Sequence, residues 1–240
     1  MVGAVAQPIV RTIDSPIAVV RTLDRTQREL FSAIESWKKT LTPPKLVVRL
    51  AVSEQRTLRS VALEPQLSAA VVRIDPVWRD DLVARADLSS LSKVSPPARG
   101  RPRIGAPRSA ADLLGWYLDG QRRFGIRWQL LAAINFVETA FGKVRNTSGA
   151  GAQGPMQFEP STWKRYGLGG NIESPRDAIF AAANYLAANG GRQDERGALF
   201  HYNPSRLYVD AVLRYADRMR EDVRTFYSYY CWRVYFRLRG

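Results

Sequence analysis

Strong helix-start and helix-stop residues punctuate the second half of this 240-residue chain, and they constrain its fold more than any other feature. A start signal at Ser174, Pro175 and Asp177 combines a cap, a proline at the first helical position and an early acid. Glycines then stop the helical pattern, as at Gly125 and Gly190. With the apolar spacing between them, these signals predict helices over 109–123, 127–141, 175–189, 194–202 and 205–220.

The first half of the chain carries weaker signals. Residues 1–20 look extended, and helical spacing predicts one helix over 24–41. The run LVVRLAV at 46–52 predicts a short strand, and the aromatic, basic tail at 226–240 also looks strand-like. Residues 60–92 fit neither pattern, and the Pro-, Gly- and Arg-rich stretch 95–108 reads as a linker or an irregular wrap. The sequence therefore predicts a mainly α protein, with an irregular α+β N-terminal region at 1–104 and a helical domain at 105–240.

Composition excludes several kinds of chemistry. A single cysteine, Cys231, cannot form an internal disulfide framework, and with the single histidine, His201, it makes a structural zinc site very unfavourable. No apolar run is long enough to span a membrane, and the first 20 residues do not resemble a signal peptide. The net charge of +14 fits either attraction to a polyanion or an arginine-rich solvated surface. No dense basic stripe interleaved with aromatics is present, so nucleic-acid binding is not expected.

One acid stands on an apolar helical stripe. Glu138 shares that stripe with Leu131, Ile134 and Phe141, at positions that the pattern marks for burial. It also lies in the last turn before Gly142, where the helix dipole disfavours negative charge. Both effects raise the pKa of a carboxyl group, and a protonated carboxyl near neutral pH is what a general acid needs.

Four motifs of the second half occur in a fixed order. They are Val137-Glu138-Thr139 with Gly142, the glycine-rich run from Ser148 to Gly154, Pro155-Met156-Gln157-Phe158 running into 160–163, and Tyr202-Asn203 with Ser205 and Tyr208. Together they resemble the signature of lytic murein transglycosylases with a lysozyme-like fold, most of all the membrane-bound lytic transglycosylase B type and its actinobacterial relatives. The resemblance covers roughly residues 105–225, and it implies a lysozyme-like helical domain there.

The resemblance also implies roles for individual residues. Glu138 matches the single catalytic acid and base. Substrate binding is implied for the other motif residues, which are Ser148, Met156, Gln157, Tyr202 and Asn203. The implied reaction cleaves the bond between MurNAc and GlcNAc in peptidoglycan without water: Glu138 protonates the linking oxygen, the MurNAc acetamido group stabilises the positive charge, and Glu138 then takes the C6 hydroxyl proton as a 1,6-anhydro ring closes.

Several further expectations follow from the resemblance. The partners would be peptidoglycan glycan strands and anionic cell-wall polymers, and the protein would act outside the cytoplasm, as a monomer, without metal or cofactor. Residues 1–104 would guide the glycan or attach the protein to the wall. Two departures from the family pattern, Glu159 after Phe158 and His201 before Tyr202, affect the expected cleft.

Three rival functions stay open. A muramidase of the lysozyme kind would hydrolyse the same bond, and inverting hydrolysis needs a second carboxylate about 6.5–9.5 Å from the first. Only Glu159 and Glu173 lie near enough in sequence to provide it. The second rival is a peptidoglycan-binding module that does not cut, and the third is a basic nucleic-acid-binding protein.

Overall fold

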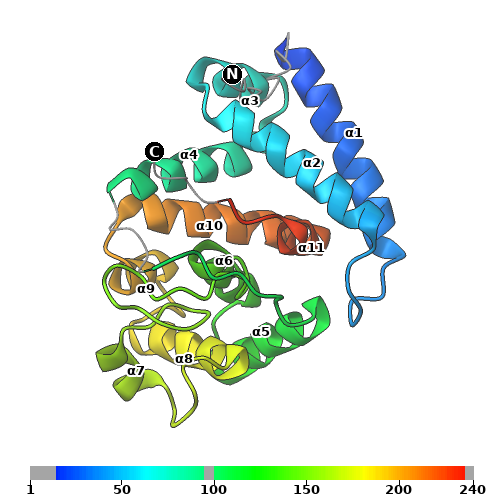
Figure 1. Ribbon diagram of the computed structural model, residues 1–240. Helices are drawn as coiled ribbons and strands as arrows, with labels where there is room; N and C mark the ends of the chain where they lie inside the picture. The colour runs from blue at the N-terminus through cyan, green and yellow to red at the C-terminus, as the bar shows by residue number, and fades with distance from the viewer. Residues whose placement is uncertain (1–14, 95–99, 236–240) are drawn as a thin grey trace, which may run out of the picture.

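The computed structural model describes residues 15–94 and 100–235, and these form helices joined by loops, the longest of them between α6 and α7 (Figure 1). The described helices are α1 (Pro16–Glu35), α2 (Lys45–Ala62), α3 (Pro65–Ile74), the 3₁₀ turn η1 (Pro76–Trp78), α4 (Arg79–Val94), α5 (Ala110–Phe124), α6 (Trp128–Thr139), α7 (Pro160–Tyr166), α8 (Pro175–Ala188), α9 (Glu195–Tyr202), α10 (Arg206–Glu221) and α11 (Val223–Cys231). Within these ranges the extended pairing amounts to two isolated bridges, Ile104 with Val144 and Gln153 with Phe158. The prediction of a mainly α chain is confirmed.

The caps that the sequence predicts are present in the second half. Ser109 Oγ accepts a hydrogen bond from the Asp112 amide at the start of α5, and Ser174 Oγ accepts one from Asp177 at the start of α8. Gly125 ends α5 with a left-handed φ of 73°. Each cap satisfies backbone groups that the helix end leaves unpaired. The predicted helix positions in this half are therefore right to within a few residues.

The strand predicted at 46–52 is wrong, because these residues open helix α2. Val47, Ala51, Leu58 and Val61 are buried on one face of that helix, so the apolar spacing over the whole 18 residues is helical. The seven-residue window was too short to show this period. The described part of the N-terminal region is therefore helical rather than α+β.

Two other expectations also change. The strand-like tail is helical over Val223–Cys231, where Asp222 caps α11 by accepting from the Arg224 amide. Helix α1 begins at Pro16, well before the predicted start at residue 24, because Ser15 caps it and a proline opens it. Residues 1–14, 95–99 and 236–240, which include parts of the predicted extended start, linker and tail, lie outside the described residues.

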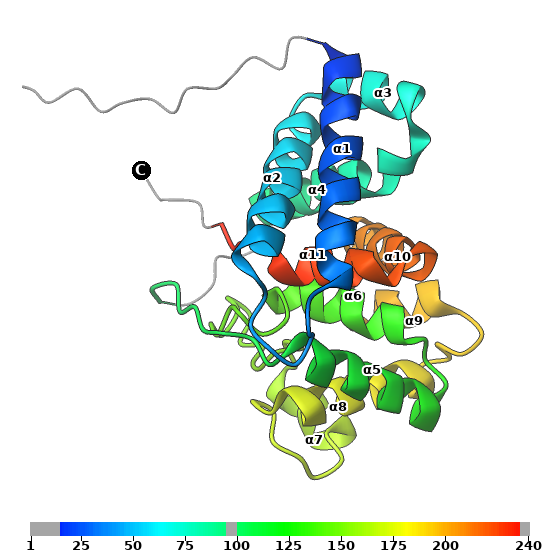
Figure 2. The same cartoon turned by 90° about the vertical axis from the view of Figure 1, so that its right-hand side faces the viewer.

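Helix α10 lies at the centre of the molecule. It packs against α4 on one side and α6 on the other, so it joins the N-terminal helices to the helix that carries Glu138 (Figures 1 and 2). Helices α5, α7 and α8 lie beyond α6, at the opposite end from α1 and α3. One continuous apolar cluster runs from Val19 in α1 to Trp232 after α11. The domain boundary at residue 104 stays a prediction.

Buried polar groups join α10 to the N-terminal helices. Arg218 in α10 forms an ion pair with Asp81 in α4 at 3.0 Å, and both side chains are almost fully buried. Asp81 also accepts from the Tyr229 hydroxyl of α11. Because a buried charge is costly without its partner, this pair fixes how the two elements meet.

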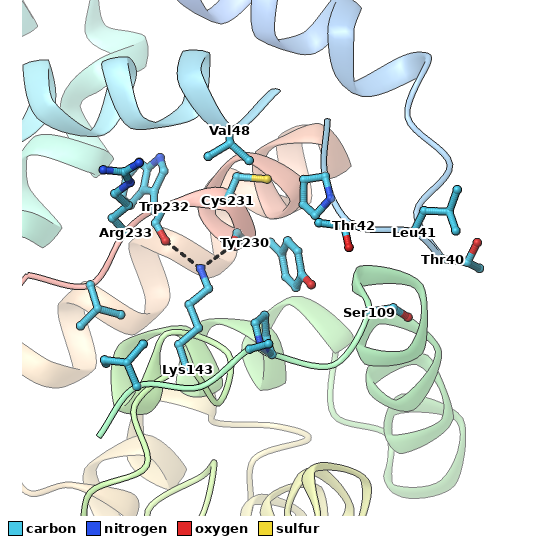
Figure 3. Close-up of a pocket in the computed structure, with 15 residues that line it drawn as sticks. Thr40, Leu41, Thr42, Val48, Ser109, Lys143, Tyr230, Cys231, Trp232 and Arg233 are labelled. Atoms are coloured by element: carbon cyan, nitrogen blue, oxygen red, sulfur yellow. Dashed lines mark hydrogen bonds between the residues drawn. The ribbon is translucent and has the colours of Figure 1, made fainter. Parts of the chain in front are cut away.

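Lys143 makes a further connection, just after the Glu138 helix (Figure 3). Its ammonium group donates to the carbonyl oxygens of Tyr230 and Trp232 at the end of α11. Burial lowers the pKa of this amine to about 8, and the nearby Cys231 thiol opposes the shift. The contact anchors the segment after α6 to the C-terminal helix.

None of the helices in the described ranges combines the length and the apolar character that crossing a membrane requires.

Candidate active site

The chain reverses direction sharply just after Glu138. Helix α6 ends at Thr139, three residues before the predicted stop at Gly142. Ala140, Phe141 and Gly142 then take left-handed φ values of 50°, 66° and 78°. Such values are unfavourable for the first two residues, so surrounding contacts must hold the turn. The turn leaves Glu138 in the last helical turn, as the sequence predicts.

A network of buried polar side chains, centred on Asn135 and Thr139, holds this turn in place. The side-chain Nδ2 of Asn135 donates to the Pro155 carbonyl at 2.8 Å, and its Oδ1 accepts from the Tyr117 hydroxyl at 2.6 Å. Thr139 Oγ1 donates to the same Pro155 carbonyl and accepts from the Gly142 amide. The network connects α5, α6 and the 147–157 loop, so the end of α6 is set rigidly against the loop motifs.

Among the residues that the structure describes, the carboxyl group of Glu138 has one direct hydrogen-bond partner, the hydroxyl of Tyr208 in α10, which donates to Oε1 at 2.7 Å. Burial among apolar neighbours raises the pKa of Glu138 to about 7, and the Tyr208 hydrogen bond opposes this shift. Leu131, Ile134 and Phe141 are all buried, as the apolar stripe predicts. The raised pKa that the sequence suggested therefore has burial as its main cause.

Glu138 opens into a cleft of about 400 Å³. Four of the other predicted residues line the same cleft: Ser148, Gln157, Tyr202 and Asn203. They come from the 147–157 loop and from the end of α9, which are far apart in the sequence. The fold thus brings the motifs together at one carboxyl group, while the roles of the individual residues stay predictions.

Met156 does not reach the cleft, which corrects the prediction for its side chain. Its side chain is fully buried, because the apolar thioether packs into the core beneath the loop. The Met156 carbonyl oxygen, however, accepts a hydrogen bond from the Tyr202 hydroxyl at 2.6 Å. The backbone of Met156 thereby sets the position of a cleft-lining ring.

The other predicted side chains serve the loop as well as the cleft. Gln157 has a φ of 51°, and its side-chain Nε2 donates to the backbone carbonyls of Gly154 and Asn146. Ser148 Oγ accepts from the Ala152 amide at 2.9 Å. Asn203 follows α9, while the cap of α10 is Ser205. The loop is therefore stabilised by the same side chains that face the cleft.

The two candidate second acids lie in different places. Glu159 lines the Glu138 cleft, where its charge adds to the effect of burial in raising the pKa of Tyr185. Glu173 lines a separate cavity, to which Thr147 and Gly154 of the 147–157 loop also contribute. Of the two residues that sequence spacing left open, only Glu159 shares a cavity with Glu138.

Tyr185 is a site residue that the sequence did not single out, and Tyr208 was part of the Tyr202-Asn203 motif without a role assigned to it. Tyr185 lines the cleft, and its hydroxyl donates to the His201 carbonyl at 2.8 Å. Tyr208 is separated from Glu138 by 70 residues, so no local pattern connects them. Its place three residues after the Ser205 cap puts it in the first turn of α10, but only the packing of α10 on α6 brings its hydroxyl to Glu138.

Comparisons with known proteins match this part of the chain. Residues 118–222, which include the whole cleft, match the family model described as the transglycosylase SLT domain. An 81-residue segment is 33% identical to the membrane-bound lytic murein transglycosylase F of Thiobacillus denitrificans. That match covers 34% of this chain and 17% of the relative, so the chain spans only a small part of that protein. No solved structure gives a significant match. The likeness to the B type stays a prediction.

Proposed function

We propose that residues 118–222, which match the transglycosylase SLT family model, form a lysozyme-like catalytic domain and that the protein is a peptidoglycan lytic transglycosylase. It cleaves the MurNAc-β-1,4-GlcNAc bond and leaves 1,6-anhydroMurNAc ends. The observation that carries the proposal is the buried carboxyl group of Glu138 at the cleft, whose pKa of about 7 lets it give and take a proton near neutral pH.

In the first step, protonated Glu138 gives its proton to the oxygen between the two sugars as the bond to MurNAc C1 breaks. The acetamido group at C2 of MurNAc stabilises the positive charge that develops at C1. Ionised Glu138 then accepts a hydrogen bond from Tyr208, which lowers the energy of the anion at the moment it forms.

In the second step, the carboxylate of Glu138 takes the proton of the C6 hydroxyl, and the C6 oxygen bonds to C1. The ring closes and Glu138 is protonated again, so no water is consumed. Gln157, Ser148 and Tyr202 would hold the glycan against Glu138, since they line its cleft. This reaction acts on polymer outside the cytoplasmic membrane, where peptidoglycan lies.

Hydrolysis of the same bond is the second candidate, because Glu159 lines the cleft and could activate water. The products decide between the two reactions. Mass spectrometry of muropeptides released from purified peptidoglycan should show anhydro ends, whereas a hydrolase would give reducing ends heavier by one water.

Two matched variants sharpen this experiment. Glu138→Gln should lower product release at least about 100-fold, because it removes general acid and base chemistry. Glu159→Gln should retain anhydro product release under the proposed mechanism and should lose activity under hydrolysis.

If Glu138→Gln cleared cell walls as fast as the unchanged protein, the domain would be a binding module. Duplex binding with steep salt dependence and no release of muropeptides would favour a nucleic-acid-binding protein.

A further inference from the structure

A second cavity, of about 760 Å³, shares the 147–157 loop with the Glu138 cleft. Ser148, Ala152 and Gln157 of this loop line the cleft, whereas Thr147 and Gly154 line the second cavity. Neighbouring residues of one loop therefore line the two spaces. Three arginines line this second space, which we call the arginine cavity: Arg103, Arg108 and Arg145.

The charges in the arginine cavity are not balanced. Glu173 is the one acid among its lining residues. Within residues 15–94 and 100–235, none of the three arginines forms an ion pair, although many other arginines of the chain do, such as Arg127 with Glu195. Arg145 donates to the Ala106 carbonyl at 3.0 Å. This bond holds its side chain against residues 100–109, the segment before α5, which we call the strap. Guanidinium groups with free donors are well suited to bind a carboxylate.

Backbone pairing fixes where these arginines stand. Residues 103–105 run antiparallel to 143–145, with the Gly105 amide donating to the Lys143 carbonyl and the Arg145 amide to the Arg103 carbonyl, both at 2.9 Å. The Arg103 amide donates to Asn146 Oδ1 at 2.7 Å. On the other side, the Tyr230 hydroxyl donates to the Arg108 carbonyl at 2.9 Å. The strap is thus tied to the segment that follows the Glu138 helix, so the two spaces keep a fixed relation.

We propose that the arginine cavity binds a carboxylate of the stem peptide carried by the glycan that occupies the cleft, an inference that rests on the proposed function. The sugar chain of peptidoglycan presents its peptide from MurNAc, and that peptide carries free carboxylates. The cavity exceeds the 400 Å³ cleft in volume, and it lies one loop away from the residues that would hold the sugars. The glycan and the peptide then bind at two separate sites that share one loop.

The test uses the Glu138→Gln protein, so that ligand is not consumed, and two probes: a GlcNAc-MurNAc tetrasaccharide with peptide stems and the same tetrasaccharide without them. Calorimetric titration of the Glu138→Gln protein should show tighter binding of the peptide-bearing probe. Adding Arg103→Gln and Arg108→Gln should weaken that binding about five- to tenfold, as expected for partly exposed ionic contacts, and should leave the peptide-free probe unchanged. The matched control is Arg21→Gln with Arg25→Gln on α1, which removes the same charge far from both spaces.

A variant that is expected to bind more tightly distinguishes the proposal from simple misfolding, because a misfolded protein would bind less. Glu173→Gln removes the acid of the cavity and should strengthen binding of the peptide-bearing probe about twofold. Equal losses for both probes, or an equal loss in the α1 control, would overturn the proposal. So would arginine-dependent binding of a phosphate-bearing wall polymer fragment with no effect on the peptide-bearing probe. Failure of the unchanged protein to cleave glycan that carries peptide stems would instead count against the proposed function.

Discussion

The Tyr208 hydroxyl donates a 2.7 Å hydrogen bond to Glu138 Oε1, and it joins the first turn of α10 to the last turn of α6. The bond stabilises the ionised carboxylate, while burial stabilises the protonated form. These opposing effects leave the pKa of Glu138 at about 7. The same group is thereby able to act first as an acid and then as a base.

Activity should fall as the pH rises through about 7, because the first step requires protonated Glu138. Tyr208→Phe removes the hydrogen bond that favours the anion, so the pKa of Glu138 should rise and the alkaline decline should move up by about one pH unit. Rates of anhydromuropeptide release measured from pH 5 to about pH 9 check this. A profile unchanged in position would show that the hydroxyl does not set the pKa.

Gly154→Ala should abolish activity and destabilise the protein by about 3 kcal/mol or more. Gly154 has a φ of 72°, and a Cβ there would lie 2.0 Å from the Ile172 carbonyl oxygen. Gly169→Ala is the matched control, because its φ is 75° and a Cβ there meets nothing within 4 Å. The control should cost about 1 kcal/mol, the penalty of the left-handed backbone alone. Urea unfolding of both variants measures the difference, and equal costs would contradict the close approach.

Glu54→Gln should stabilise the protein at pH 8. Glu54 is buried in α2, accepts from the Ser228 hydroxyl and has its pKa raised to about 7, chiefly by burial. The folded state therefore holds this proton more tightly than the unfolded state, and the stability it contributes below pH 4.5 is lost as the pH rises to about 7. The neutral amide should recover up to about 3 kcal/mol at pH 8. Unfolding free energies at pH 5 and at about pH 8 check it; an equal effect at both would exclude titration of Glu54.

Asp81→Asn should destabilise the protein by about 3 kcal/mol, because it removes the buried charged partner of Arg218 and leaves that guanidinium only its pair with the more exposed Glu221. Asp210→Asn is the control: its pair with Arg196 is exposed and should contribute less than about 1 kcal/mol. Denaturant unfolding, followed by α-helical circular dichroism, measures both. Similar small costs for the two variants would show that the contact between α4 and α10 does not depend on the buried pair.

The sequence by itself determined α5, α6, α8, α9 and α10 of the second half and the unusual acid, but not α7 or α11. Ser109, Ser174 and Ser205 satisfy helix ends locally, so their effect is visible in a short stretch of sequence. The place of Glu138 on an apolar stripe near a helix end is likewise local, and burial is indeed the main cause of its raised pKa. The prediction at 46–52 failed because a seven-residue window cannot distinguish a buried helical face from a strand.

Only the tertiary structure decided what surrounds Glu138. Tyr208 reaches it because α10 packs on α6, and Glu159 lines its cleft whereas Glu173 lines a separate cavity. Met156 turns into the core, while its carbonyl holds Tyr202. The arginine cavity also arises from a strap and a loop that are distant in sequence. Caps and periodicity act within a few residues, whereas these contacts depend on how whole helices pack, and no local pattern records that.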